Sequence, residues 1–152
     1  VQETLIETYA AHYLNPNNHN MTLFPEALSC LQRLQQQGYW LAIATGKGRS
    51  GLDKAIAQTD TQAFWLETAC ASEYPSKPAP DMVLALCDRL GVEPEEAVVV
   101  GDTTHDLEMA ANAKIRAIAV ATGAHTAQQL SSMPHVAILN SLAELPDVLE
   151  TL

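Results

Sequence analysis

The fold is decided by the stretch Val98-Val99-Val100-Gly101-Asp102-Thr103-Thr104-His105-Asp106, in which an apolar strand ends in Gly-Asp and a second acid follows. Carboxylates at the exit of a buried strand must be solvated, paired or bound to a metal ion. In an open α/β sheet, that exit is also where ligands bind. Two acids there indicate a hard cation such as Mg²⁺, which prefers oxygen ligands. The same residues fit a helix N-cap formed by Asp102 or Thr103, and both interpretations stay open at this point.

Outward from this stretch, apolar strands alternate with amphipathic helices that short loops connect. The pattern predicts strands over residues 39–44, 64–70, 97–100, 117–120 and 136–139. It predicts helices from Pro25 to Gly38 and over residues 52–57, 80–90, 104–113, 126–131 and 142–149. Such alternation is typical of a parallel sheet with helices on both faces. We therefore expect a three-layer, Rossmann-like α/β domain.

The beginning of the chain reads differently. Residues 2–14 predict a helix, because the apolar side chains fall on one helical stripe, made of Leu5, Ile6, Tyr9 and Tyr13. The run Asn15-Pro16-Asn17-Asn18-His19-Asn20 is a strong breaker and predicts a linker. We expect residues 1–20 to be the remnant of a separate helical segment with its linker, and residues 21–152 to form the core domain.

Composition narrows the class of partner. The chain has 152 residues, with 8 Lys+Arg against 18 Asp+Glu and a formal net charge of -10. This acidity argues against nucleic acid and anionic membranes as partners, and no apolar run approaches the length of a membrane span. The three cysteines, Cys30, Cys70 and Cys87, lack metal-ligand spacing and lie in apolar stretches. They predict reduced core thiols and a cytoplasmic location.

A second candidate site follows the predicted strand that ends near residue 44, in Thr45-Gly46-Lys47-Gly48. The Thr45 hydroxyl can donate to an oxyanion, and glycines let backbone N–H groups approach it closely. The stretch does not fit a Walker A loop, which needs a longer glycine-rich spacing. An ordinary strand-to-helix turn remains the alternative.

A third candidate site is Ser76-Lys77-Pro78-Ala79-Pro80. Two prolines fix the backbone around Lys77, so its ammonium group would be a point charge held in place, which suits a phosphate ligand. A surface lysine before a proline-started helix is the alternative.

Taken together, the three sites resemble the haloacid-dehalogenase-like (HAD) hydrolase superfamily, and most closely its phosphoglycolate-phosphatase-like branch. Thr45 matches the family's Thr or Ser at a strand end, and Lys77 matches its Lys before Pro. Asp102 and Asp106 match its Gly-Asp followed four residues later by Asp. The resemblance runs from about Leu23 to Leu149. Receiver domains use similar residues, but in them the acids precede the Thr and the Lys.

The resemblance implies a phosphatase that needs Mg²⁺ and acts on a small phosphorylated metabolite through an aspartyl-phosphate. Asp102 would bind Mg²⁺, and Asp106 would bind it directly or through water. Thr45 and Gly46 would bind the phosphoryl group, and Lys77 would neutralise both this group and the nucleophile. A further expectation is that Lys47, Arg49 and Asp53 line the entrance, although solvated loop charges fit them as well. Lys114 stands where the family usually has Gly at a helix end.

One departure affects the predicted chemistry. The family's nucleophile is the first Asp of an Asp-x-Asp motif on the first strand, and no two aspartates here are separated by one residue. We therefore expect the first strand and most of the helical cap to lie upstream of Val1, with residues 1–14 as the last cap helix. The 152-residue chain would then be inactive alone, and either an upstream segment or self-association would fill the sheet. A phosphomutase, a dehalogenase and a non-catalytic fragment completed by a partner chain remain alternatives.

Overall fold

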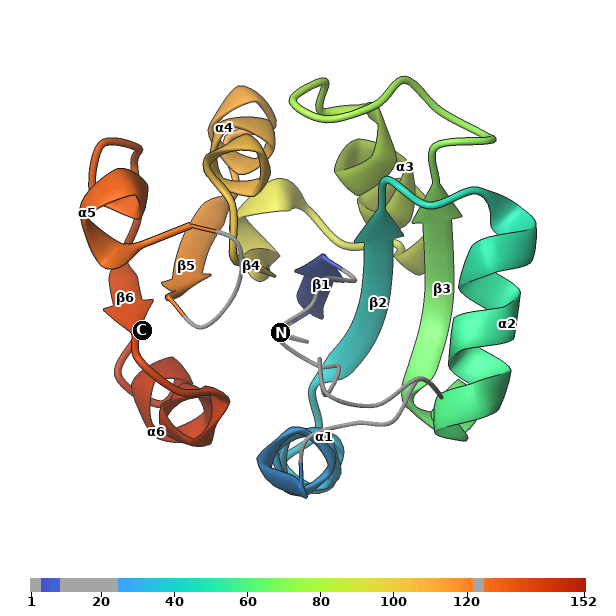
Figure 1. Ribbon diagram of the computed structural model, residues 1–152, viewed down its shortest axis with the longest axis horizontal. Helices are drawn as coiled ribbons and strands as arrows, with labels where there is room; N and C mark the ends of the chain where they lie inside the picture. Colours follow the sequence, from blue (N-terminus) through green and yellow to red (C-terminus); the bar gives the residue numbers. More distant parts are fainter. Residues whose placement is uncertain (1–3, 9–24, 122–124) are drawn as a thin grey trace.

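The computed structural model describes residues 4–8, 25–121 and 125–152, and these form a parallel sheet between layers of helices (Figure 1). The strand order is β3-β2-β1-β4-β5-β6, and every neighbouring pair is parallel. The three-layer α/β prediction is therefore confirmed. The strands are β1 Thr4–Thr8, β2 Trp40–Thr45, β3 Trp65–Cys70, β4 Ala97–Gly101, β5 Arg116–Val120 and β6 Ala137–Leu139.

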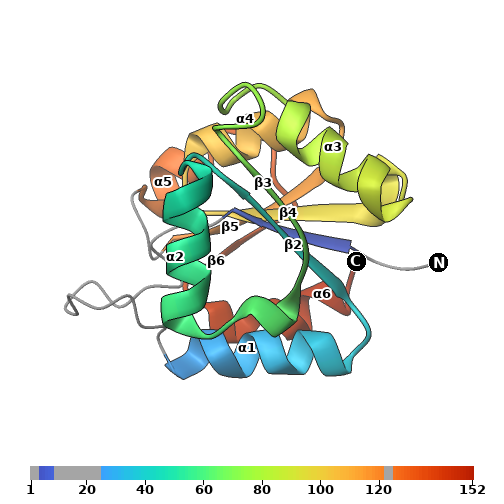
Figure 2. The ribbon, with the colours of Figure 1, turned by 90° about the vertical axis from the view of Figure 1, so that its right-hand side faces the viewer.

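The helices cover both faces of the sheet. Figure 2 shows α1 and α6 on one side of it and α3 and α4 on the other. Short 3₁₀ turns precede β3, β4 and α6, at Gln62–Phe64, Pro94–Glu96 and Leu142–Glu144. The helices are α1 Pro25–Gln36, α2 Arg49–Thr59, α3 Asp81–Leu90, α4 Thr104–Asn112, α5 Ala127–Leu130 and α6 Leu145–Leu149.

Alternation along the central strands divides the core into two main layers. Val98 and Val100 of β4 pack with Leu31 of α1 and Leu145 of α6. On the other face, Val99 packs in a cluster that α3 and α4 supply, through residues such as Met82, Leu86 and Leu107. A strand with helices on both faces is apolar throughout, which explains why β4 reads as an unbroken valine run.

The N-terminal helix prediction is wrong where the structure describes it. Thr4–Thr8 forms strand β1, which pairs with β2 on one side and with β4 on the other. The place that we expected an absent first strand to leave empty is therefore occupied by this segment. Its β-branched residues favour extended backbone. Two neighbouring strands also supply backbone hydrogen-bond partners, whereas an isolated short helix is only marginally stable. The predicted linker at residues 15–20 lies outside the described residues, and the boundary at residue 20 stays a prediction.

Elsewhere the predicted elements are confirmed with small shifts. Helix α2 begins at Arg49, three residues before the predicted start, and runs to Thr59. The predicted helix over 142–149 begins as a 3₁₀ turn. All three cysteines are buried, and none of them forms a disulfide with another cysteine of the described residues. In the described parts of the chain, no helix has the length and apolar character needed to cross a membrane.

Candidate active site

The candidate site lies at the carboxyl ends of the central strands. Thr45 is the last residue of β2 and Asp102 directly follows β4, with β1 between the two strands. From β1 the chain adds strands outward in one direction to β3, and then in the other direction from β4 to β6. Ligands of open α/β sheets bind where the strand order reverses in this way. Two strand spacings put the Thr45 and Asp102 strands about 10 Å apart.

Both polar residues at these strand ends are buried. Thr45 is 1% exposed and Asp102 is 2% exposed. The Thr45 hydroxyl accepts a hydrogen bond from the Lys47 backbone N–H at 3.1 Å, which orients the turn after β2. Gly46 within this turn is exposed, with open space where a Cβ would lie. The turn after β2 is therefore open to solvent at Gly46.

Asp106 organises the start of helix α4. Its Oδ2 accepts hydrogen bonds from Asp102 N at 3.2 Å, Thr103 N at 3.1 Å and Thr103 Oγ1 at 3.0 Å. Thr103 is the N-cap and accepts from the Asp106 N–H in return, so the two residues form a capping box. The N-cap interpretation is thus confirmed for Thr103. It does not compete with a ligand-binding role for Asp102, which stands just before the cap.

Lys77 contacts Asp106 from the segment between β3 and α3. Its Nζ lies 2.6 Å from Asp106 Oδ1, and the two side chains are 16% and 1% exposed. Asp106 Oδ1 thus pairs with Lys77, while Oδ2 accepts from backbone and hydroxyl donors. The sequence prediction that Lys77 and Asp106 belong to one site is consistent with this contact. Asp106 is buried, because the N-terminal cap of α4 and Lys77 enclose it.

Gly101 is a site residue that the sequence reasoning missed. A Cβ built there would lie 2.4 Å from Asp106 Cβ and 2.7 Å from both Cγ and Oδ2. Only a residue without a side chain therefore allows the Asp106 carboxylate to fold back over the end of β4. The signal in the sequence was a Gly placed directly before Asp102.

Arg49 and Asp53 do not line the site as free charges. The Arg49 guanidinium contacts Glu73 at 2.8 Å and Asp53 at 3.3 Å. The hydrogen bond with Glu73 is the main cause that raises the pKa of Arg49, and the same bond lowers the pKa of Glu73. Lys47 makes no ion pair within the described residues, so its expected place at the entrance stays a prediction.

Two further contacts around the site escaped the sequence analysis. The Asn112 side chain, at the end of α4, donates to the Pro78 carbonyl at 3.0 Å, directly after the cis bond between Lys77 and Pro78. The Thr104 N–H donates to His125 Nδ1 at 3.0 Å. Neither contact follows a local pattern, because each joins segments more than twenty residues apart.

The donor set of the site consists of carboxylate oxygens. Asp102 and Asp106 are the two carboxylates at the exit of β4, and within the described residues no group of three or more His, Cys, Asp or Glu side chains could hold a metal ion. Mg²⁺ is commonly bound through one or two carboxylates and keeps several waters. The carboxylates of Asp102 and Asp106 therefore fit a hydrated Mg²⁺.

Comparisons with known proteins agree with this arrangement. The sequence pattern of the family described as haloacid dehalogenase-like hydrolase matches residues 1–120. The chain is 34% identical over 125 residues to the probable phosphatase IndB of Dickeya dadantii, covering 81% of this chain and 54% of that protein. It is 30% identical over 145 residues to the pyrophosphatase PpaX of Bacillus velezensis, covering 94% and 67% respectively. A phosphoglycolate phosphatase of Aquifex aeolicus is 32% identical over 110 residues, covering 70% and 51%.

Solved structures share the fold. The crystal structure of a haloacid dehalogenase-like hydrolase from Bacteroides fragilis matches with a TM-score of 0.77 and 30% identity, covering 81% of this chain and 59% of that one. The chain thus spans between half and two thirds of the length of these relatives. A family pattern that matches most of the residues, together with this shared sheet, shows that the chain belongs to the haloacid dehalogenase-like hydrolase family.

Proposed function

We propose that the whole protein is a Mg²⁺-dependent phosphatase of small phosphate monoesters. The observation that carries the proposal is the Lys77–Asp106 ion pair, which brings a cation to the buried carboxylates at the exit of β4. Relatives named as phosphatases, among them the one from Dickeya dadantii, support the reaction class. Uncatalysed hydrolysis of phosphate monoesters is among the slowest reactions known, so neutralisation of charge is the main requirement.

Each residue has a defined role in this proposal. The Thr45 hydroxyl donates to a phosphoryl oxygen, and the exposed Gly46 turn lets backbone N–H groups approach it. The Lys77 ammonium neutralises the phosphoryl group, and Asp106 keeps that ammonium in place. Asp102 holds Mg²⁺ with waters, and Asp106 contributes directly or through water. When bound, the metal ion supplies positive charge to the phosphoryl oxygens.

The proposed nucleophile is a carboxylate that attacks phosphorus, expels the ester oxygen and forms an acyl phosphate that water then hydrolyses. In the family this residue is an Asp on the strand next to those of Thr45 and Asp102. Strand β1 holds that place here, and its sequence, Thr-Leu-Ile-Glu-Thr, contains no Asp. We therefore propose that the 152-residue chain alone has no phosphatase turnover. Its reduced, buried cysteines support a cytoplasmic location for the whole protein.

The test compares the whole protein with two of its variants in a screen of small phosphate esters, with and without Mg²⁺. Wild type is expected to release phosphate only with Mg²⁺, and Asp102→Asn to remove most of the activity and to weaken Mg²⁺ binding measured by calorimetry. Asp88→Asn is the matched control, since Asp88 is exposed and lies in the last turn of α3. Undiminished turnover in Asp102→Asn would remove Asp102 from the site.

The same screen separates the alternatives. A dehalogenase would release halide without Mg²⁺, and a phosphomutase would convert a sugar phosphate without net release of phosphate. Phosphate release by the 152-residue chain alone, verified by intact mass, would refute the proposal that this chain lacks its nucleophile.

A further inference from the structure

The loop over residues 71–80 delivers Lys77 to the site from the edge of the sheet. It leaves the edge strand β3 and leads into α3, and Figure 1 shows it beyond the carboxyl end of β3. Lys77 lies near the middle of this loop, which has no regular secondary structure of its own. A lysine on such a segment reaches Asp106 reproducibly only if something else fixes the loop.

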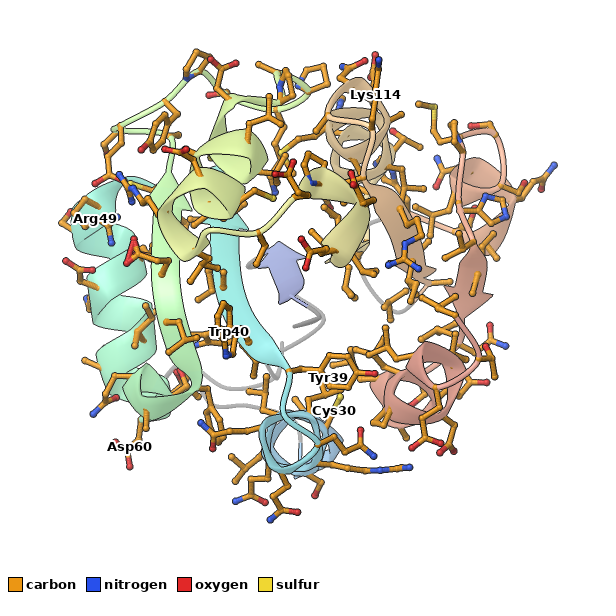
Figure 3. The ribbon with its side chains drawn as sticks, turned by 180° about the vertical axis from the view of Figure 1, so that it is seen from behind. Cys30, Tyr39, Trp40, Arg49, Asp60 and Lys114 are labelled. Atoms are coloured by element: carbon orange, nitrogen blue, oxygen red, sulfur yellow. The ribbon has the colours of Figure 1, made fainter. Side chains whose placement is uncertain are left out.

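One anchor of the loop is Arg49, at the start of α2 (Figure 3). Its Nη2 donates to Glu73 Oε1 at 2.8 Å, and its Nη1 donates to Thr68 Oγ1 at 2.8 Å. Its backbone N–H also donates to Ser72 Oγ at 2.9 Å. Arg49 therefore ties the first residues of the loop to α2 and to the edge strand.

A second anchor comes from α3. Arg89 Nη2 donates to the Tyr74 hydroxyl at 2.5 Å, and the guanidinium carbon lies 5.6 Å from the centre of the Tyr74 ring. Arg89 Nη1 donates to the Thr68 carbonyl at 3.3 Å and also pairs with Glu67 Oε1 at 3.4 Å. Like Arg49, Arg89 thus connects a loop residue to the edge strand.

The two arginines reach the same strand residue from opposite faces of the sheet. Helix α2 packs against Ile43 and Cys70, whereas α3 packs against the face that carries Ala69. Arg49 Nη2 approaches the Thr68 carbonyl at 3.5 Å, and Arg89 Nη1 donates to the same oxygen at 3.3 Å. A charge-assisted hydrogen bond holds geometry better than a neutral one.

We propose that this arginine clamp, made of Arg49, Arg89, Thr68, Glu73 and Tyr74, positions the Lys77 loop so that the Lys77 ammonium stays on Asp106. The proposal adds positioning residues to the proposed phosphatase site and rests on the role of Lys77 there. Glu73 and Tyr74 precede Lys77 by four and three residues, so fixing them shortens the free segment that leads to the ammonium. Shortening that segment lowers the entropy lost when Lys77 is ordered.

The alternative is that the clamp only protects the exposed edge of β3. Charged side chains at an edge strand discourage pairing with other chains. In that case, releasing Glu73 and Tyr74 would leave Lys77 where it is. The two roles therefore differ in one observable, which is how well Lys77 is protected from solvent.

The experiment measures lysine acetylation rates in the 152-residue chain under native conditions, by mass spectrometry. The chain has four lysines, and Lys77 is paired with Asp106 whereas Lys54 and Lys114 are exposed. The Asp106→Asn variant gives the acetylation rate of a Lys77 that has lost its ion-pair partner. The clamp is opened by the double variant Glu73→Gln with Tyr74→Phe. Glu67→Gln is the matched control, because Glu67 also pairs with Arg89 but lies on the strand and not on the loop.

We expect the double variant to raise the acetylation rate of Lys77 about fivefold, while the rates of Lys54 and Lys114 stay unchanged. A fivefold change corresponds to a weakening of the Lys77–Asp106 contact by about 1 kcal/mol, which is within the range for exposed ion pairs. Glu67→Gln should leave all rates unchanged. An unchanged Lys77 rate in the double variant, or an equal rise in Glu67→Gln, would overturn the proposal. So would a Lys77 that reacts no faster in Asp106→Asn. None of these results depends on turnover, so phosphatase activity of the whole protein can succeed or fail separately.

Discussion

Replacing Gly101 by Ala should destabilise the fold strongly, although it adds a single methyl group. The new Cβ would lie 2.4 Å from Asp106 Cβ, against about 3.4 Å for the closest ordinary contact. The Asp106 side chain must therefore move by about 1 Å, or the backbone of β4 must shift. Either change acts on a side chain that is 1% exposed and held at the start of α4.

The cost follows from the contacts that a 1 Å shift would break. Asp106 Oδ2 accepts three hydrogen bonds of 3.0 to 3.2 Å, and Oδ1 lies 2.6 Å from Lys77 Nζ. Hydrogen bonds to a charged group contribute about 1.5–3 kcal/mol each, and overpacking alone costs about 1–3 kcal/mol. Because the site can relax in part, we expect a loss of about 3–5 kcal/mol, a large part of the total stability of a domain.

Urea denaturation followed by far-UV circular dichroism measures this loss. Gly46→Ala is the matched control, because a Cβ there has open space, and it should change the unfolding free energy by less than about 0.5 kcal/mol. A second check combines Gly101→Ala with Asp106→Gly, which removes all three atoms that the new Cβ would meet. In that background the cost of Gly101→Ala should fall below about 1 kcal/mol. A loss below about 1 kcal/mol in the single variant, or the same loss in both backgrounds, would refute the reasoning.

Three further predictions concern other parts of the fold. Lys114 follows α4 with a φ of 61° (Figure 3), so Lys114→Gly should stabilise the protein by about 0.5–1 kcal/mol, whereas Lys114→Ala, which keeps the Cβ, should not raise the melting temperature. The Arg49 hydrogen bond lowers the pKa of Glu73. The stability that Glu73 contributes is therefore complete above the ordinary carboxyl pKa and is lost as the pH falls through the lowered pKa. The unfolding free energies of wild type and Glu73→Gln, measured by urea titration, should converge in acid. Burial raises the pKa of the Cys87 thiol to about 11, so iodoacetamide should label Cys87 slowly at neutral pH and rapidly in urea, and rapid native labelling would contradict the buried position.

The sequence by itself determined most of the architecture, because burial and turn chemistry leave local traces. The unbroken valine run of β4 indicated a strand covered on both faces. Helix α3 ends at Leu90, the predicted boundary, where Gly91 adopts a φ of 69°. The order of Thr45, Lys77 and Asp102 along the chain indicated the family before any geometry was known, and the matching family pattern confirms that assignment.

Tertiary structure decided what depends on partners distant in the chain. The segment Thr4–Thr8 belongs to the stretch 2–14, whose apolar spacing predicted a helix, but it forms a strand. The reason is that β2 and β4 offer backbone partners on both sides, which the local sequence cannot reveal. Asp106 is enclosed because Lys77 approaches it from a loop twenty-nine residues upstream. The arginine clamp likewise joins α2, α3 and the edge strand through side chains, and no sequence spacing predicts these contacts. Local patterns record the environment of a residue, whereas the contacts that position a site arise only when separate segments are brought together by the fold.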